Sequence, residues 1–381
     1  MNKKKIFYWS PHINDQVATV KSVKNSIYSL KKFGEENYEV YLFNVFGEWD
    51  ILNDEFKKIN VKLISVCDFK VNGPIHGFIK SRLFYIFISL ISLIKLPFIL
   101  KKYNPDTIIC HLIVFPILIL SNFYHKKIKF ILRVSGLPKL NLFRYFYWKY
   151  LSKKLHRVTC PTEKTREDLV KNSIFISEKV KLLEDPVFII RNLFNNEDLK
   201  FKIDRKFILA VGRLTKQKNF ELLIQAVEII SKRKPDMFVI IVGSGEQENL
   251  LNNLIAQRNL KGNVKIIPFT KSISSYYKNA DFFISTALWE DPGFAILEAA
   301  MFNLTVLSSD CLNGPKEFTK GEIRALKFKN NNLQELVSKL NLILDHKISE
   351  ENLKIKKINA KKYCKQFTIF SHYQKLKKII N

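Results

Sequence analysis

The chain has 381 residues, of which 47% are hydrophobic, and this is enough for two α/β domains of ordinary size with buried cores. Its five cysteines form no Cys-x-x-Cys pair and its seven histidines show no His-Glu-x-x-His spacing, so the sequence gives no support to a disulfide framework, a zinc site or a metalloenzyme. The apolar run after the basic N-terminus stops at Pro11, which is too short for the core of a signal peptide and predicts a first strand instead.

The net charge is +28, and in the first half of the chain the excess lies in one block. Residues 69–162 contain 16 Lys or Arg and one acidic residue, Asp106, so this block carries +15. Residues 1–190 also carry +15, from 31 basic and 16 acidic residues, so the rest of that half is neutral. Such a block favours an anionic partner: phospholipid headgroups, a polyprenyl phosphate or nucleic acid. An AT-rich genome, which enriches Lys, Ile and Asn everywhere, is the alternative explanation.

Short apolar runs alternate with longer amphipathic segments, and the intervals between the runs suit crossover helices. Runs of this kind are typical of parallel strands that are buried on both faces. They form two series, and each series predicts one doubly wound sheet. The first series is Ile6–Ser10, Glu39–Phe43, Val61–Val66, Thr107–His111 and Lys129–Val134, and the second is Phe207–Val211, Phe238–Val242, Val264–Ile267, Phe282–Ser285 and Thr305–Ser308.

The two series predict two domains that join near Asp185–Arg205, where Pro186 blocks a helix and a polar stretch follows. We expect an N-terminal domain over residues 1–187 and a C-terminal domain over residues 188–365. The pattern is helical toward the end of the chain, and residues 366–381 are expected to form a C-terminal helix. Such a helix can pack back on the N-terminal domain, which the sequence alone does not show.

Two segments of the first domain bear on membranes. Leu83–Leu100 is apolar apart from Lys95 and Pro97, and its uninterrupted part of 12 residues is short of the ~20 needed to span a bilayer. It is either a buried crossover helix or a helix that lies in the membrane interface. Asn141–Arg157 is rich in aromatic and basic residues, which suits the headgroup region, with a half-buried helix as the alternative. Its aromatic residues are Phe143, Tyr145, Phe146, Tyr147 and Trp148.

The first chemical motif follows the predicted strand Phe207–Val211, where a turn at Gly212 leads to a helix that begins near Asn219. Such a turn points backbone N–H groups and the helix dipole at one place, which favours a phosphate. Arg213 and Lys218 add a planar fork and a point charge, a pair that suits a diphosphate. A solvated basic loop is the alternative.

The second chemical motif is a pair of glutamates, Glu290 and Glu298, eight positions apart. A strand is predicted to end at Ser285, and Gly293 opens a helix that contains Glu298. Carboxylates accept hydrogen bonds from vicinal hydroxyls, so they fit a ribose and a sugar ring. The N–H groups at Gly293–Ala295 lie at a helix N-terminus, where they can bind a phosphate or stabilise developing negative charge. The alternative is that each glutamate, taken alone, is an ordinary solvated surface residue.

Gly243-x-Gly245 lies between the two motifs above, and Asp310-x-x-x-Gly314-Pro315 follows them. In this chain order, the four motifs resemble those of the family-4 retaining glycosyltransferases. These have the GT-B fold, in which two Rossmann-like doubly wound domains face each other across a cleft. The resemblance covers the C-terminal half well and the N-terminal half loosely. The variants Glu290–Phe294 and Ser309–Pro315 resemble the subgroup that assembles bacterial surface polysaccharides such as lipopolysaccharide or capsule. The complete fingerprint Gly-x-Gly-x-x-Gly is absent, which argues against a nicotinamide or flavin enzyme. The matching motifs are Gly212-Arg213-Leu214 with Lys218, Gly243-x-Gly245, Glu290-x7-Glu298 and Asp310-x-x-x-Gly314-Pro315.

The resemblance implies a retaining, metal-independent hexosyltransferase with its donor site in the C-terminal domain and its acceptor site in the N-terminal domain. Arg213 and Lys218 would neutralise the donor diphosphate as it leaves, and Glu290 would contact the donor sugar hydroxyls. These three residues are the catalytic candidates. Glu298 would hold the ribose hydroxyls. The remaining donor-binding candidates are Gly212, Gly243, Gly293, Phe294 and Ala295 around the phosphates, and Pro268, Phe269 and Thr270 beside the base.

The N-terminal half departs from the family pattern at two places. Many relatives carry a Gly-Gly turn after the first strand, where this chain has Ser10–Asp15. Many also have a histidine at the end of the strand near residues 129–136, where this chain has Arg133. For His111, a hydrogen-bonded histidine at a strand end is the alternative to an acceptor role. The acceptor-side candidates are His12, Asn14, His111, Ser135 and Gly136.

The sequence therefore predicts transfer of a hexose or N-acetylhexosamine from a nucleotide sugar, most simply a UDP-sugar, to a lipid-linked glycan or polysaccharide, with no cofactor. We expect a cytoplasmic protein, peripheral on the inner face of the cell membrane, that meets an anionic membrane surface and no nucleic acid. One alternative is a GT-B sugar-nucleotide epimerase or hydrolase, which shares the domain pair. Another is a basic nucleic-acid-binding protein, which leaves the donor motifs unexplained. A third is an inactive homologue.

Overall fold

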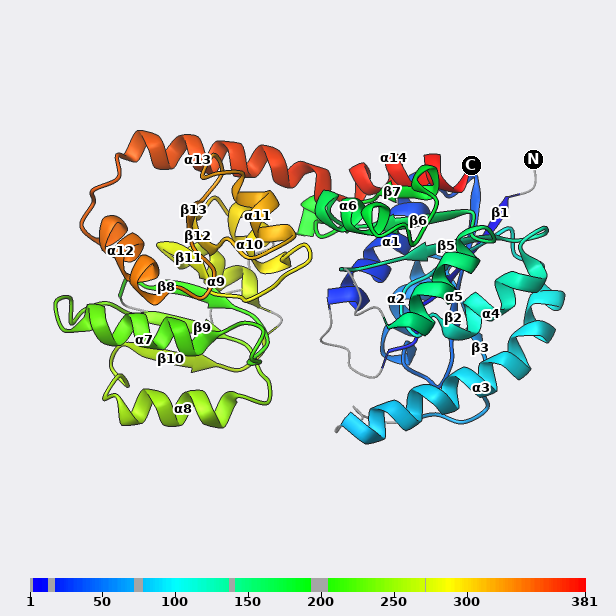
Figure 1. The fold of residues 1–381 in the computed structure, drawn as a ribbon, viewed down its shortest axis with the longest axis horizontal. Helices are drawn as coiled ribbons and strands as arrows, with labels where there is room; N and C mark the ends of the chain where they lie inside the picture. Colours follow the sequence, from blue (N-terminus) through cyan, green and yellow to red (C-terminus); the bar gives the residue numbers. More distant parts are fainter. Residues whose placement is uncertain (1–2, 13–17, 72–77, 137–140, 193–204, 271) are drawn as a thin grey trace. The chain divides into compact units, whose positions relative to one another are not determined.

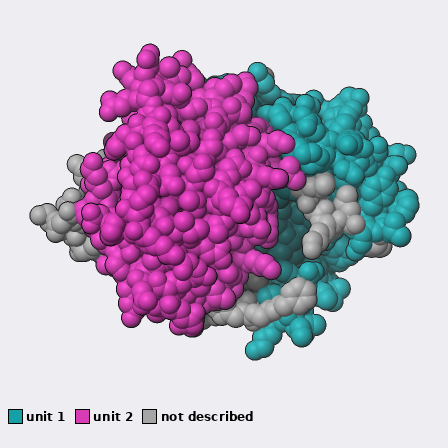
Figure 2. Space-filling view, turned by 60° about the vertical axis from the view of Figure 1, so that its left-hand side comes forward, with its two compact units in different colours: residues 1–188, 367–381 teal, residues 189–366 magenta. Residues whose placement is uncertain are grey.

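The computed structural model describes residues 3–12, 18–71, 78–136, 141–192, 205–270 and 272–381. It divides into two compact units, one formed by residues 1–188 and 367–381 and the other by residues 189–366 (Figure 2). Each unit has one parallel sheet with helices on both faces (Figure 1), which is a doubly wound, Rossmann-like arrangement. The prediction of two Rossmann-like domains is confirmed, and their facing across a cleft stays a prediction.

The sheet of the first unit has seven parallel strands in the order β3-β2-β1-β4-β5-β6-β7. The order runs outward in both directions from β1, where Tyr8 pairs with Leu42 of β2 and Trp9 pairs with Cys110 of β4. Every residue of β4 is buried, because helices cover both faces of the sheet. The strands are β1 (Lys4–Trp9), β2 (Tyr38–Asn44), β3 (Lys62–Ser65), β4 (Thr107–Cys110), β5 (Lys129–Arg133), β6 (Arg157–Cys160) and β7 (Val180–Leu182).

Alternate residues along these strands enter two separate cores. Phe7 and Ile108 face a core shared with α3, α4, α5 and α6, whereas Tyr8 and Ile109 face a core shared with α1, α2 and α14. This alternation follows from the two-residue period of a strand. The helices of the first unit are α1 (Ala18–Gly34), α2 (Asn53–Lys58), α3 (Phe78–Tyr103), α4 (Phe115–Tyr124), α5 (Leu142–Ser152), α6 (Glu163–Lys171) and α14 (Ile369–Ile380).

The sheet of the second unit has six parallel strands in the order β10-β9-β8-β11-β12-β13. Helices α7, α8 and α12 cover one face, and α10 packs with α13 on the other (Figure 1). The strands are β8 (Ile208–Val211), β9 (Val239–Val242), β10 (Val264–Ile267), β11 (Phe282–Ser285), β12 (Thr305–Ser309) and β13 (Leu326–Phe328). The helices are α7 (Phe220–Ser231), α8 (Glu248–Gln257), α9 (Ile273–Asn279), α10 (Phe294–Met301), α11 (Gly314–Thr319), α12 (Leu333–Leu344) and α13 (Glu350–Cys364).

The structure departs from the sequence expectations in short strands and helix ends. The strands β6, β7 and β13 have only three or four residues and include Arg157, Lys181 and Lys327, so they lack the apolar runs used to find the others. Helix α3 continues through Pro97 to Tyr103, well beyond the uninterrupted apolar run, because side chains on both sides of the proline pack in the core. Helix α5 ends at Ser152, before the β6 strand begins.

Helix α14 is anchored on the first unit by buried polar contacts as well as by apolar packing. His372 donates from Nδ1 to the carbonyl oxygen of Glu184 at 2.7 Å. Its Nε2 atom accepts from the hydroxyl of Ser26 on α1 at 2.8 Å, and the same Ser26 oxygen lies 2.8 Å from the hydroxyl of Tyr8. Lys375 forms an ion pair with the Glu184 carboxylate. The neutral imidazole satisfies both of its neighbours, so its protonation would break this network.

We expect the first unit to lose stability on mild acidification because of His372. Burial, with Arg133 and Lys375 nearby, lowers the pKa of His372 to about 3, whereas an unfolded histidine titrates near pH 6.5. Between these values the unfolded chain binds the extra proton, so stability is full above pH 6.5 and falls as the pH decreases. The loss from this residue is about 1.4 kcal/mol per pH unit.

Urea unfolding at neutral and mildly acidic pH measures this loss through tryptophan fluorescence, because Trp9, Trp49 and Trp148 all lie in the first unit. His372→Gln keeps a donor and an acceptor without a titrating ring and should make the dependence less steep, while His111 of the same unit continues to contribute. His346→Gln removes an exposed histidine of the second unit and serves as the control. An unchanged pH dependence in His372→Gln would contradict the assignment.

Candidate active site

The predicted donor residues lie on the loops that follow the carboxyl ends of the strands in the second unit and in the first turns of helix α10. The strand order reverses between β8 and β11, which pair side by side. In open α/β sheets, ligands bind at such a switch point because the two following loops diverge there. Here the two loops are also joined, since the Leu288 N–H donates to the carbonyl of Gln217 at 2.8 Å and the Thr286 hydroxyl donates to that of Lys218 at 3.0 Å.

Lys218 and Glu290, predicted from separate motifs, form an ion pair. Their side chains are only 16% and 11% exposed, so each charge needs the other in this poorly solvated place. The backbone of Glu290 is fixed as well, because its carbonyl accepts a hydrogen bond from the Gly314 N–H at 3.2 Å and the residue forms a parallel bridge with Asn313. The structure therefore places a cation and a carboxylate together at the switch point.

Arg213 lies on the same loop as Lys218 and is exposed. Among the described residues, Gln217 is the one that accepts a hydrogen bond from its guanidinium, at 3.4 Å. Gln217 in turn donates to the carbonyl of Trp289 at 2.8 Å, which links the β8 loop to the residue before Glu290. Most of the Arg213 donors thus remain available to an anion that approaches this edge of the sheet.

The glycines of the β8 and β9 loops permit close contact between the two backbones. A Cβ atom on Gly243 would overlap the carbonyl oxygen of Gly212, and one on Gly245 would overlap that of Leu214. A Cβ atom on Gly212 would meet the Lys218 side chain at 2.8 Å. The Gly243-x-Gly245 motif therefore lets the β9 loop pack against the backbone of the β8 loop, and the absence of a Cβ atom at Gly212 leaves room for the Lys218 side chain.

The N-terminus of α10 opens beside Glu290. Gly293 precedes the helix with a φ of +92°, a conformation that favours glycine, and Phe294 and Ala295 are its half-buried first residues. Because the first amides of a helix have no partner within the helix, they favour an anion. The approach to this helix is closely packed, since a Cβ atom on Gly314 would overlap the Pro292 carbonyl.

Glu298 lies half-buried in α10 and is oriented by a residue that the sequence did not reveal. Tyr277 of α9 donates its hydroxyl to Glu298 Oε2 at 3.1 Å. Burial, together with the adjacent carboxylate, raises the pKa of Tyr277 well above its usual range, so the phenol stays protonated and remains a donor. No spacing or motif marks Tyr277, because its partner is 21 residues away in the chain.

Pro268, Phe269 and Thr270, predicted beside the base, follow β10 at the same edge of the sheet. Pro268 is exposed, and Phe269 has 54% of its surface exposed. The Phe269 N–H donates to the hydroxyl of Ser244 in the β9 loop at 3.0 Å, so the two loops are connected. An exposed aromatic ring at this edge provides a surface on which a planar base can stack.

Two acceptor-side candidates of the first unit are histidines at strand ends. His12 follows β1 and is buried, with its ring 4.5 Å from that of Trp49. His111 follows β4, and its Nε2 atom is buried with no hydrogen-bond partner in the described part of the chain. Burial, then Arg133 and His372, lowers the pKa of His111 well below its usual range, so the ring is neutral.

The other acceptor-side candidates are Ser135, Gly136 and Asn14. Ser135 is exposed and Gly136 has a φ of +80°, and both follow β5, the neighbour of β4. Asn14 lies outside the described residues. Arg133, which stands where a histidine is common in relatives, is buried and pairs with Asp185 at 2.7 Å, which gives it a structural partner.

Two Rossmann-like domains with parallel sheets in one chain form the GT-B architecture, and comparisons with known proteins agree with it. Residues 193–362 match the family model described as "Glycosyl transferases group 1". An uncharacterized glycosyltransferase of Methanocaldococcus jannaschii is 28% identical over 266 residues, which cover 64% of this chain and 65% of the relative. The UDP-Gal:alpha-D-GlcNAc-diphosphoundecaprenol alpha-1,3-galactosyltransferase of Escherichia coli is 27% identical over 241 residues, 60% of either protein. The chain thus spans less than two thirds of the length of these curated relatives.

Solved structures share the whole fold at low sequence identity. A glycosyltransferase from Rickettsia africae superposes with a TM-score of 0.79 at 18% identity, covering 100% of this chain and 98% of its own. Anabaena HepE in complex with UDP superposes with a TM-score of 0.69 at 14% identity, covering 99% of both chains. These similarities establish the GT-B fold for the full length of the chain.

We expect Gly243→Ala to destabilise the second unit. The new methyl group would overlap the Gly212 carbonyl, and relief of such crowding costs about 1–3 kcal/mol. Gly262→Ala is the matched control in the same unit, because no atom lies within 4 Å of its added Cβ. Urea unfolding followed by circular dichroism compares the two. Equal stability of both variants would show that the β8 and β9 loops are not in close contact.

Proposed function

We propose that the protein transfers a hexose or N-acetylhexosamine from a UDP-sugar to a lipid-linked glycan or polysaccharide, with retention of configuration. The observation that carries the proposal is the Lys218–Glu290 pair at the switch point between β8 and β11. The match of residues 193–362 to group 1 glycosyl transferases supports the same activity.

The geometry supports a division of roles among the donor residues. Arg213 and Lys218 bind the diphosphate, and Lys218 exchanges the Glu290 carboxylate for a phosphate oxygen when the donor enters. This exchange frees Glu290 to accept hydrogen bonds from the sugar hydroxyls. Glu298, oriented by Tyr277, accepts from the ribose hydroxyls. The amides at Gly293–Ala295 add a positive helix end for the phosphates.

Transfer with retention requires bond breaking and bond making on one face of the sugar. The bond from the anomeric carbon to the diphosphate oxygen breaks, the acceptor oxygen bonds to that carbon from the same side, and the acceptor proton passes to the departing phosphate. We propose that the two cations, Arg213 and Lys218, stabilise the leaving charge without a metal ion, so no cofactor takes part. The Escherichia coli relative is named for a UDP-sugar donor and an alpha linkage, which supports this stereochemistry by analogy.

We further propose a lipid-linked acceptor and a cytoplasmic, peripheral position on the inner face of the cell membrane. The same relative is named for a diphosphoundecaprenol acceptor. The basic block at residues 69–162 lies in the first unit, which also holds the candidates His12 and His111. Positive charge on the acceptor-side unit suits both a polyprenyl diphosphate and the headgroups around it.

The single most informative experiment is a thermal-shift series with UDP, GDP, ADP and their sugars, with and without EDTA. A ligand that binds only the native state adds about 2.7 kcal/mol of stability at a hundredfold excess over its Kd. We expect stabilisation by uridine nucleotides that EDTA leaves unchanged. Stabilisation by one of the other bases would reassign the donor, and no response to any nucleotide would remove the donor site. Conversion of the donor without acceptor would favour an epimerase or hydrolase.

We expect Lys218→Ala and Glu298→Ala to abolish transfer while the protein stays folded. Each variant removes a charged hydrogen bond to the donor, which is worth about 1.5–3 kcal/mol, so UDP affinity should fall about tenfold or more. Lys216→Ala provides the control, because Lys216 is an exposed lysine on the same loop. Calorimetric titration with UDP measures the difference. Full activity or undiminished affinity in either site variant would refute the donor-site assignment.

A further inference from the structure

Helix α3 exposes a row of large apolar side chains along one side. Six of them recur at intervals of three or four residues and are each between 57% and 73% exposed. At 100° per residue they fall within about 120° of the helix circumference. The row extends over about 28 Å of helix, much longer than the isolated apolar residues of an ordinary soluble surface. We call these residues the α3 row: Ile79, Leu83, Ile86, Leu90, Ile94 and Phe98.

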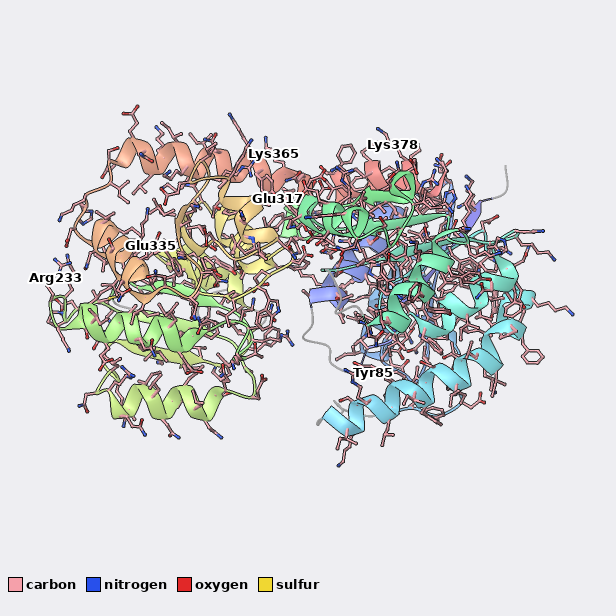
Figure 3. The ribbon with its side chains drawn as sticks, in the orientation of Figure 1. Tyr85, Arg233, Glu317, Glu335, Lys365 and Lys378 are labelled. Atoms are coloured by element: carbon pink, nitrogen blue, oxygen red, sulfur yellow. The ribbon has the colours of Figure 1, made fainter. Side chains whose placement is uncertain are left out.

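The opposite side of the same helix is part of the core. Ile88, Leu96 and Leu100 are nearly or fully buried against the sheet, and Ser92 lies between them. Helix α3 therefore is the crossover helix between β3 and β4, and it is also apolar on its outer side (Figure 1; Tyr85 is labelled on this helix in Figure 3). The two interpretations of this segment that the sequence left open apply to opposite faces of one helix.

The packing also bears on how α3 can meet a bilayer. By length and composition, Ile79–Tyr103 is able to cross a membrane, with a mean hydropathy of 2.3, although core helices of soluble proteins pass the same test. Both ends of α3, however, connect to strands of one sheet, and 28% of its apolar window is buried. A spanning orientation would pull Ile88, Leu96 and Leu100 out of the core, whereas an orientation in the membrane plane leaves them in place.

The charges around the α3 row identify the kind of partner. Lys80 and Arg82 are exposed at one end of the helix, and Lys101 and Lys102 are exposed at the other. Residues 69–105 contain no acidic residue. A second copy of this chain would bring like charges together at such a face, which opposes association. Apolar side chains flanked by Lys and Arg instead match the boundary between acyl chains and anionic headgroups.

Two neighbouring helices in the same layer also expose apolar or basic side chains. Helix α4 packs beside α3 and exposes Phe123, and α5 packs beside α4 and exposes Phe146 and Lys149. Other aromatic residues of α5, among them Tyr145 and Trp148, are instead half-buried against the core. The structure therefore makes α3, rather than the aromatic segment of α5, the main candidate for membrane contact.

We propose that α3 is an in-plane membrane anchor. The α3 row inserts among the acyl chains of an anionic bilayer while the basic residues at both ends of the helix contact the phosphates. The inference adds a surface and an insertion mode to the peripheral position proposed above, and it needs none of the donor-site residues. Its failure is therefore distinguishable from failure of the transferase activity.

Vesicle co-sedimentation of the full chain tests the anchor. The vesicles are phosphatidylcholine with and without phosphatidylglycerol, at low salt and at about 1 M salt, where the Debye length is near 3 Å. We expect binding to the anionic vesicles that persists in part at high salt. Leu90→Glu with Ile94→Glu removes two inserted side chains and should weaken binding about tenfold or more. Lys101→Glu with Lys102→Glu should remove mainly the salt-sensitive part.

The matched control is Leu250→Glu with Ile358→Glu, which alters two half-exposed apolar residues of the second unit and should leave vesicle binding unchanged. Circular dichroism and urea unfolding report that each variant remains folded, without reference to the donor site. Quenching by lipids with brominated acyl chains should be stronger for Phe98→Trp than for the parent protein, which shows insertion. Vesicle binding unaffected by the Leu90/Ile94 change, or binding lost completely at high salt, would overturn the proposal. A lipid-free dimer that the same change dissociates would assign the row to a second copy instead.

Discussion

The strands β8 and β11 are neighbours in the second sheet, yet the helices that follow them cover opposite faces of it. Because the strands themselves are buried on both faces, polar side chains that bind a ligand must lie in the loops at the carboxyl edge. The divergence of the two helices leaves room there, and the Lys218–Glu290 pair occupies the position where the two loops are joined. The Gly243-x-Gly245 turn packs against the β8 loop of this pair, and the α10 helix begins close to Glu290.

The first unit has the same doubly wound topology, but it differs in its histidines and in its last helix. The half-buried His111, which is neutral, follows β4, and the α14 helix, which holds the buried and neutral His372, comes from the far end of the chain. The network of His372, Ser26 and Glu184 makes this helix an integral layer of the unit. A chain that leaves a domain and returns to complete it couples the integrity of that domain to the whole sequence.

In the first unit, the positive charge is combined with the apolar outer face of α3. Charge alone attracts a protein to an anionic surface but leaves it loosely held and sensitive to salt. The apolar α3 row adds a contact that salt does not screen, and the lysines at the helix ends limit how deep the helix can enter. An acceptor with a polyprenyl chain would meet the protein in the same plane, so the anchor and the proposed substrate share one chemical environment.

The sequence by itself determined that there are two parallel sheets and where most of their strands lie along the chain, because buried parallel strands require apolar runs. It also predicted the residues of the donor motifs, because phosphate-binding turns favour glycine and cations. It missed β6, β7 and β13, whose few residues carry charges. Only the tertiary structure brought Lys218 to Glu290 and Tyr277 to Glu298, 72 and 21 residues apart in the chain, and placed α14 on the first unit. Such pairs depend on which strands are neighbours, and the spacing of one sequence carries no record of that choice. For the same reason the outer face of α3 was undecided until its packing was known, since an apolar helix looks alike in sequence whether its partner is a sheet, a lipid or both.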